Sequence, residues 1–192
     1  MSARHTVYTI SPSPDSTLAI EIKRSGLVKR KHLFVFEQYS GALMYDPEQP
    51  LESVLNLSIE ASSVTCRDPH SKRRRQDHLT QFARSQALAA GDHPLITVQS
   101  QRFMAKQLRG FIAEGTLSFR GVDRMLKANI GFGVPKKDRL QIDADATLRL
   151  SEYNLPRPSS LFGLIRTEDD VVLHALIWGT TANAQATAPS RS

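Results

Sequence analysis

The stretch Leu140-Gln-Ile-Asp-Ala-Asp-Ala-Thr-Leu-Arg-Leu150 alternates apolar and polar residues without a break. Successive side chains of a β-strand point to opposite faces, so a strand with this pattern has one apolar face and one polar face. A helix would instead spread the same apolar residues around its whole circumference. The stretch therefore predicts a half-buried strand of an antiparallel sheet.

The same period of two recurs along most of the chain. Further strands are expected at residues 7–10, 18–23, 33–45, 55–60, 95–100, 108–120, 125–132 and 171–178. Residues 67–91 break the alternation, and Asp77–Ala90 within them is rich in Ala, Gln, Arg and Leu, which favour helix. Gly121 and Pro135–Asp138 are expected at tight corners between paired strands.

The number of strands and the length of the chain indicate one domain. A chain of 192 residues, 40% of them hydrophobic, is long enough for one substantial core. We expect an all-β fold, an antiparallel up-and-down β-barrel of about eight strands with one short helical insertion; a sandwich of two sheets is the alternative. The barrel is expected over residues 1–179, and the small polar residues 180–192 are expected to form a disordered tail.

The interior of an eight-stranded barrel is just wide enough to be filled by side chains or to hold one small ligand. Small residues at inward positions, Ala113, Gly115, Ala128, Ala144 and Ala146, favour a cavity. A core filled by larger residues opposite them is the alternative. The residues expected to line the cavity are Ile20, Ile22, Leu55, Leu57, Ile59, Ile96, Val98, Leu117, Phe119, Leu126, Ile130, Ile142, Leu148, Leu173 and Ile177.

The composition narrows the class of protein further. The single Cys66 excludes an internal disulfide framework. No apolar run approaches the ~18 residues that span a bilayer, and the first residues lack the apolar stretch of a secretory signal. We therefore expect a cytoplasmic protein.

The net charge of +6 is concentrated in two segments. Residues 23–31 contribute +5 and residues 67–84 contribute +4, so the rest of the chain sums to −3. Arginine pairs bidentately with phosphate oxygens, and the run of Lys72, Arg73, Arg74 and Arg75 is the expected site for a headgroup or another anion. Two other roles stay open for this run, attraction to an anionic membrane surface and a solvated loop without a ligand.

Several segments resemble the YceI-like family of lipocalin-like barrels. Tyr8-Thr-Ile10 resembles the opening strand, and Tyr39-Ser-Gly-Ala-Leu-Met-Tyr-Asp-Pro47 resembles a strand end of that family. Asp77-His-Leu79 followed by His93-Pro-Leu-Ile-Thr-Val-Gln-Ser100 is similar to its helix and next strand. Gly115-Thr-Leu-Ser-Phe-Arg-Gly-Val-Asp-Arg124 is similar to a further stretch.

The resemblance spans residues 7–179 and implies a barrel that binds polyisoprenoids or other long-chain lipids. The chain departs from the family pattern at the insert 69–76, at His93, where an aromatic residue is usual, and at Val98, where Phe is usual. These departures concern the ligand more than the fold.

No catalytic motif is evident in the sequence. His70, His78 and His93 are near the helical insertion but lack the spacing of metal ligands. Cys66 lies beside Arg67 without a base partner, and a buried structural thiol is the favoured interpretation. Asp143 and Asp145 share the polar face of one strand and are expected to be solvated, and Gly131-Phe-Gly133 is too short for a phosphate-binding loop. We expect no catalytic residue, no metal and no cofactor, and hence a protein that is not an enzyme.

The expected function is binding or transport of a long-chain amphiphile, a polyisoprenoid or a fatty-acid-like lipid, inside the barrel. One alternative is nucleic-acid binding through the basic segments, with Phe34, Phe36 and Tyr39 as the nearest aromatic residues. Another is a filled-core interaction domain, which forms a homodimer through an open edge strand or the apolar end near Trp178.

Overall fold

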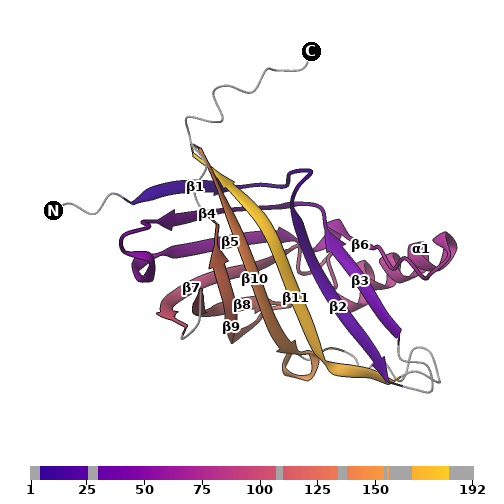
Figure 1. The fold of residues 1–192 in the computed structure, drawn as a ribbon. Helices are drawn as coiled ribbons and strands as arrows, with labels where there is room; N and C mark the ends of the chain where they lie inside the picture. Colours follow the sequence, from indigo (N-terminus) through magenta and orange to yellow (C-terminus); the bar gives the residue numbers. More distant parts are fainter. Residues whose placement is uncertain are drawn as a thin grey trace, which may run out of the picture.

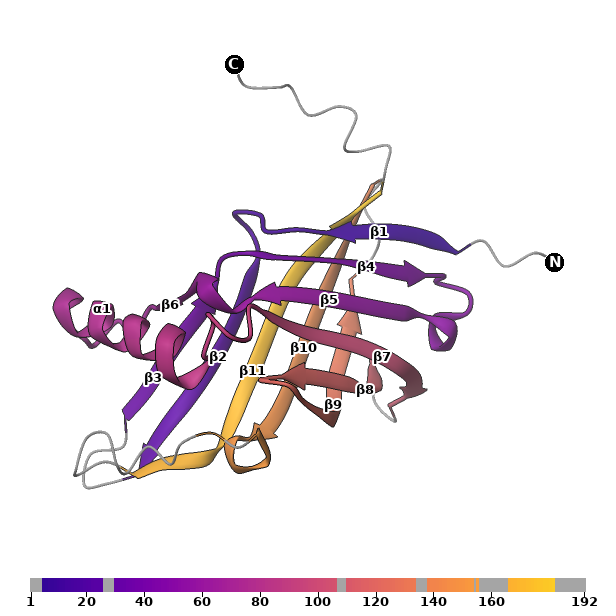
Figure 2. The ribbon, with the colours of Figure 1, turned by 180° about the vertical axis from the view of Figure 1, so that it is seen from behind.

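The computed structural model describes residues 5–25, 30–106, 110–133, 138–153, 155 and 166–181. Its strands and its α-helix are β1 (Thr6–Ile10), β2 (Thr17–Ser25), β3 (Arg30–Phe36), β4 (Tyr39–Tyr45), β5 (Val54–Glu60), β6 (Val64–Cys66), α1 (Arg73–Phe82), β7 (Leu95–Ala105), β8 (Phe111–Phe119), β9 (Val122–Phe132), β10 (Arg139–Arg149) and β11 (Arg166–Thr180). Short helical turns are η1 (Pro50–Glu52), η2 (Ala61–Ser63), η3 (Ala83–Ala87) and η4 (Leu150–Tyr153). Figures 1 and 2 show the strands curled around one interior, with α1 at one end.

The eleven strands behave as eight, because three long strands are each interrupted once. β1 and β2 both pair with β11, Ile10 opposite Gly179 and Leu18 opposite Ala175. In the same way β4 pairs with β1 and β3 pairs with β2, so β3 and β4 form a second divided strand. β5 pairs with β4 and β6 pairs with β3, which gives the third. The order then runs through β7, β8, β9 and β10 back to β11, with every pairing antiparallel. The predicted up-and-down barrel of about eight strands is confirmed, and the sandwich is wrong.

The three interruptions lie at one level of the barrel. Residues 11–16, 37–38 and 61–63 separate the halves of the three long strands, and the register places Phe36 opposite Val64 just beyond them. The first interruption contains two prolines, which have no N–H for a ladder. The second interruption divides the expected single strand 33–45 into β3 and β4. The sequence did not predict β6, which is the short continuation of β5 after the third interruption.

Helix α1 and turn η3 occupy the gap between β6 and the start of β7. The helix begins at Arg73 and not at Asp77 as expected, and η3 continues it to Ala87. The backbone N–H of Cys66 donates to Thr80 Oγ1 at 2.9 Å, so a helix side chain replaces a partner strand along β6. At the end of this helical segment, Arg120 donates to the carbonyl oxygens of Gln86 and Ala87. These hydrogen bonds hold the segment against the turn between β8 and β9.

The corner predicted at Gly121 is confirmed. Phe119 and Val122 are opposite each other, and the two residues between them, Arg120 and Gly121, have positive φ angles of 51° and 71°. This is the geometry of a two-residue hairpin whose twist matches that of its strands. The corner expected at 135–138 and the strand start expected at Leu108 lie outside the described residues, apart from Asp138.

The last strand extends slightly beyond residue 179, and the domain boundary itself stays a prediction. β11 includes Thr180, and the N–H of Thr181 donates to the carbonyl oxygen of Asp138, so both residues belong to the barrel. Residues 182–192, where the disordered tail was expected, lie outside the described residues.

One end of the barrel is closed by aromatic rings. The ring of Phe132 lies 4.6 Å from that of Tyr45, 6.1 Å from that of Phe103 and 5.6 Å from that of Phe111. These four residues come from the ends of β9, β4 and β7 and the start of β8, on the side of the molecule away from α1 (Figure 1). We call this the closed end.

Candidate functional site

A cavity of about 810 Å³ lies inside the barrel. Its volume is in the upper part of the range of about 300–1,000 Å³ that small-molecule sites occupy in proteins. The four aromatic residues of the closed end do not line it, so the cavity stops short of them. The filled-core alternative requires an interior that side chains fill, and the cavity shows that they do not fill it.

The structure places every residue that the sequence assigned to the cavity around it. All fifteen, from Ile20 to Ile177, line the cavity, and so do the five small residues from Ala113 to Ala146. The strand at 139–149 shows why the pattern worked: Ile142 and Ala146 line the cavity and are buried, whereas Asp143 on the opposite face is exposed and does not line it. Lining the cavity is a matter of position, and a role of these residues in ligand binding remains a prediction.

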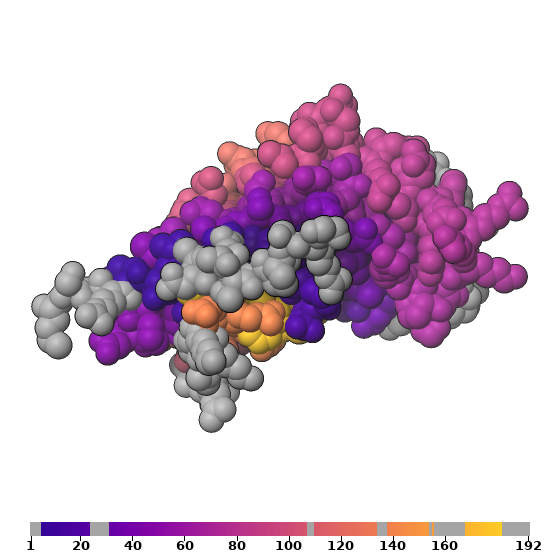
Figure 3. All heavy atoms as spheres, turned by 90° about the horizontal axis from the view of Figure 1, so that it is seen from above, coloured from indigo at the N-terminus to yellow at the C-terminus, as the bar shows by residue number. Residues whose placement is uncertain are grey.

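The cavity opens at the end where α1 lies. Lys72, Arg74, Arg75 and His78 line it and are all exposed, whereas deep lining residues such as Ile142 are almost fully buried. We call this the open end. Figure 3 shows the α1 segment, in magenta, forming one end of the molecule with side chains that extend into solvent.

Three of the four basic residues assigned to an anion site lie together at the open end. Lys72 is the N-cap of α1, and Arg74 and Arg75 lie in its first turn. Arg73 is exposed on the same turn but does not line the cavity. Arg73, Arg74 and Arg75 are therefore helical and not part of a loop, and all four residues are solvated. Binding of an anion or of a membrane surface by this run stays a prediction.

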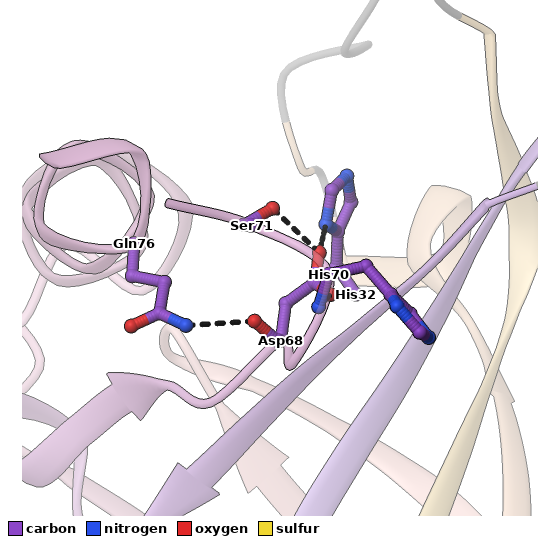
Figure 4. Close-up of polar contacts among 5 residues, drawn as sticks. All are labelled: His32, Asp68, His70, Ser71 and Gln76. Atoms are coloured by element: carbon purple, nitrogen blue, oxygen red, sulfur yellow. Dashed lines mark hydrogen bonds and ion pairs between the residues drawn. The ribbon is translucent and has the colours of Figure 1, made fainter. Parts of the chain in front are cut away.

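Asp68 organises the polar side of the open end. Its carboxylate accepts hydrogen bonds from the Ser71 hydroxyl, from the backbone N–H of His70 and from Nδ1 of His32, the last at 2.8 Å (Figure 4). Gln76 of α1 donates to the backbone carbonyl oxygen of Asp68. Burial alone would raise the pKa of Asp68, but these hydrogen bonds outweigh burial and hold the pKa below its usual range.

His32 is a cavity residue that the sequence interpretation missed. It is 7% exposed, lines the cavity and lies in β3 opposite Ile22 of β2. The signal was present, because His32 shares the period of two with Phe34 and Phe36, which are buried. Leu79 and Phe82 of α1 also line the cavity. In the sequence they follow the arginines at helical spacing, so no alternation with a period of two marked them as cavity residues.

Two observations concern a metal site and a reactive thiol. No group of three or more His, Cys, Asp or Glu side chains among them is placed to hold a metal ion. Cys66 is a buried free thiol, and burial raises the pKa of this thiol despite the nearby Arg75, which disfavours the reactive thiolate.

The aromatic residues near the first basic segment are inside the protein. Phe34, Phe36 and Tyr39 are all buried, so none offers a ring face on which a nucleotide base stacks. Lys31 in the same region forms an ion pair with Glu21 at 2.8 Å. The structure therefore gives the nucleic-acid alternative no support in this segment.

Within the part of the chain that the structure describes, none of the helices has the length and apolar character needed to cross a membrane.

Comparisons with solved structures agree with this fold. BcnA of Burkholderia cenocepacia has a TM-score of 0.68 at 15% identity, covering 86% of this chain and 96% of its own. A polyisoprenoid-binding domain from Saccharophagus degradans, implicated in plant cell wall breakdown, has a TM-score of 0.66 at 14% identity, covering 91% and 99%. The YceI protein of Campylobacter jejuni has a TM-score of 0.55 at 21% identity, covering 77% and 83%. At these identities the likeness concerns the fold.

The sequence comparisons are more specific. No curated protein matches the chain. The sequence profile of the YceI-like domain matches residues 8–177, which covers nearly the whole barrel from β1 to β11. The eight-stranded barrel, its cavity and this match lead to one conclusion: the chain belongs to the YceI-like family.

Proposed function

We propose that the protein binds and carries a long-chain amphiphile, an isoprenoid or an acyl lipid, with its apolar tail inside the barrel. The observation that supports this most directly is the cavity of about 810 Å³, which is lined mainly by aliphatic side chains, closed at one end and open at the other. A tail enters at the open end, and the headgroup stays there beside α1. The polyisoprenoid-binding domain among the structural neighbours supports the same class of ligand.

The energetics of such binding need no specific polar contact with the tail. Transfer of one methylene group from water to an apolar site contributes ~0.8 kcal/mol. A tail of about twelve such units gains on the order of 10 kcal/mol, before the loss of translational and conformational freedom is subtracted. The wall of aliphatic residues is therefore sufficient for tight binding.

The cavity wall also explains why several inward residues are only half-buried. Ile20, Ile22 and Leu173 point to the same side as buried core residues yet keep part of their surface accessible. Exposed apolar surface inside a protein has no partner atoms and favours an apolar occupant. A bound tail supplies the missing contacts.

Analysis of the protein as purified tests the proposal. Native mass spectrometry, followed by extraction into organic solvent, is expected to find a co-purifying long-chain molecule. If the extracted protein binds no long-chain probe under any condition, the proposal is wrong.

A cavity-filling variant provides the matched test. Ala146 lines the cavity, and Thr147, the next residue of β10, is exposed on the outer face. Ala146→Phe is expected to lower the affinity for a long-chain fluorescent probe at least tenfold, because the ring occupies space that the tail needs. Thr147→Tyr adds similar bulk outside and is expected to leave the affinity within about twofold. Equal effects of the two variants would count against a tail in the barrel.

A further inference from the structure

We infer that the open end of the barrel is a binding site for the phosphate headgroup of the amphiphile, formed by Lys72, Arg74 and Arg75 of α1 and by His32 of β3. This inference rests on the proposed function, since a headgroup lies at the open end only when its tail occupies the cavity. It adds the chemical class of the ligand and a residue, His32, outside the basic run.

The first observation is unpaired positive charge at the border of an apolar cavity. Lys72, Arg74 and Arg75 line the cavity, and none of them forms an ion pair with an acidic residue in the described part of the chain. Binding of an apolar tail requires no cation. Three cations exceed what a single carboxylate neutralises, whereas a phosphate monoester carries about −1.5 to −2 near pH 7 and pairs with arginine through two parallel hydrogen bonds.

The helix end adds to this field. The N-cap residue Lys72 has no side-chain hydrogen bond to the first turn of α1. The first backbone N–H groups of a helix carry partial positive charge and favour an anion. The uncapped end of α1 and its basic side chains therefore act in the same direction.

The second observation is independent of the helix and concerns His32. The His32 side chain is 9% exposed and lines the same cavity. Its Nδ1 is 2.8 Å from Oδ2 of Asp68, so Nε2 is the ring nitrogen that remains for a ligand in the cavity. A phosphate oxygen is a suitable partner, because Nε2 donates to it from the imidazolium form or accepts the P–OH proton in the neutral form.

Asp68 connects the two halves of the site. It positions His32 through Nδ1, and through Ser71 and Gln76 it also holds the start of α1 (Figure 4). Ser71 immediately precedes Lys72 in the chain. The carboxylate thus fixes the distance between the buried imidazole and the basic turn that faces the same cavity.

The test compares three ligands with one tail. Dodecanol, dodecanoate and dodecyl phosphate compete with a fluorescent long-chain probe for the delipidated protein, below their critical micelle concentrations. The wild-type protein is expected to bind dodecyl phosphate at least tenfold more tightly than dodecanol, with dodecanoate between them. Raising the NaCl concentration from 50 to 500 mM should reduce this preference, because the charges are partly solvated.

Matched variants assign the preference to residues. Arg74→Gln combined with Arg75→Gln is expected to lower the affinity for dodecyl phosphate at least tenfold and to leave dodecanol within twofold. Arg73→Gln changes a charge on the same turn outside the cavity and is expected to have less than a twofold effect. His32→Asn keeps a donor at the position of Nδ1, and hence the bond to Asp68, but lacks Nε2; a three- to tenfold loss for dodecyl phosphate alone is expected.

The outcomes separate the inference from the proposed function. Equal affinities of the wild type for the three ligands would overturn the headgroup site and leave the tail site in place. Absence of binding by all three would overturn both. An effect of Arg73→Gln as large as that of the double variant would reveal general charge attraction instead of a site. Displacement of the probe by 1 mM inorganic phosphate alone would indicate a site for the free anion, which also contradicts a headgroup site.

Discussion

Arg84 donates its Nε–H to the backbone carbonyl oxygen of Val64 at 2.9 Å, across the point where the barrel lacks a strand. β6 pairs with β3 on one side only, and α1 covers its other side. Arg84 and Thr80 together satisfy backbone groups that a neighbouring strand would otherwise bind. The open edge strand on which the homodimer hypothesis depended is therefore occupied by the protein's own helix, at least at β6.

Removing this bond should weaken the attachment of the helix. Arg84→Met retains most of the side-chain bulk but leaves the Val64 carbonyl without its partner, which is expected to lower the free energy of unfolding by about 1–2 kcal/mol. Urea denaturation measures the change. Gln86→Met, on an exposed residue of the same segment, is the control and should change stability by less than about 0.5 kcal/mol.

The carboxylate of Asp68 should make stability depend on acid. Its pKa in the folded protein lies below that of the unfolded chain, so it stabilises the fold at pH values above the unfolded pKa of about 3.9. This contribution disappears as the pH falls through the folded pKa. Asp68→Asn is expected to cost about 1–3 kcal/mol at pH 5, because buried donors lose their acceptor, and its difference from the wild type should shrink as the pH falls below about 4.

Urea titrations at pH 5, 4 and 3 measure this convergence. A constant difference across the interval would mean that the charge of Asp68 contributes nothing.

Two glycines of neighbouring strands provide a test of close packing. A Cβ atom on Gly115 would lie 2.3 Å from the carbonyl oxygen of Gln99, beside the irregularity in β7 between Ser100 and Arg102. Gly115→Ala is therefore expected to destabilise the barrel by about 1–3 kcal/mol. A Cβ atom on Gly131 meets nothing within 4 Å, so Gly131→Ala should be neutral or should stabilise by about 0.4–1 kcal/mol. Thermal unfolding of both variants shows the difference in sign.

The rings of the closed end should block a second exit for a bound tail. Phe132 contacts Tyr45, Phe103 and Phe111, and Phe132→Ala removes the ring that all three share. We expect a loss of about 2–3 kcal/mol in stability, less than for a fully buried Phe because Phe132 is half-buried. Release of a fluorescent long-chain probe, followed by stopped flow, should become faster. Val7→Ala, an exposed residue of β1, is the control and should change neither quantity.

The fold was predictable because one physical constraint repeats along the chain. A strand that packs one face inward must alternate, and the stretch 140–150 alternates so strictly that the cavity residues of the neighbouring strands followed from the same parity. Gly121 was predictable for a second local reason, since positive φ favours glycine. The alternation of the strands and the turn at Gly121 depend on residues that are close together in the sequence.

The missed features depend on tertiary contacts. The start of α1 at Arg73 was not predicted, because three consecutive arginines lack an apolar face and the helix is held instead by Gln76, Thr80 and Arg84. The bond between His32 and Asp68 joins residues 36 positions apart. Nothing local to either residue specifies that pairing.

The position of the closed end also determines how the protein can be attached to a surface or to a fusion partner. β1 begins and β11 ends on the side away from α1 (Figure 1). A sensor chip, bead or fusion partner joined beyond either strand would therefore lie next to the closed end, and the open end would face the solvent. Immobilised protein should consequently take up ligand from solution as readily as free protein does.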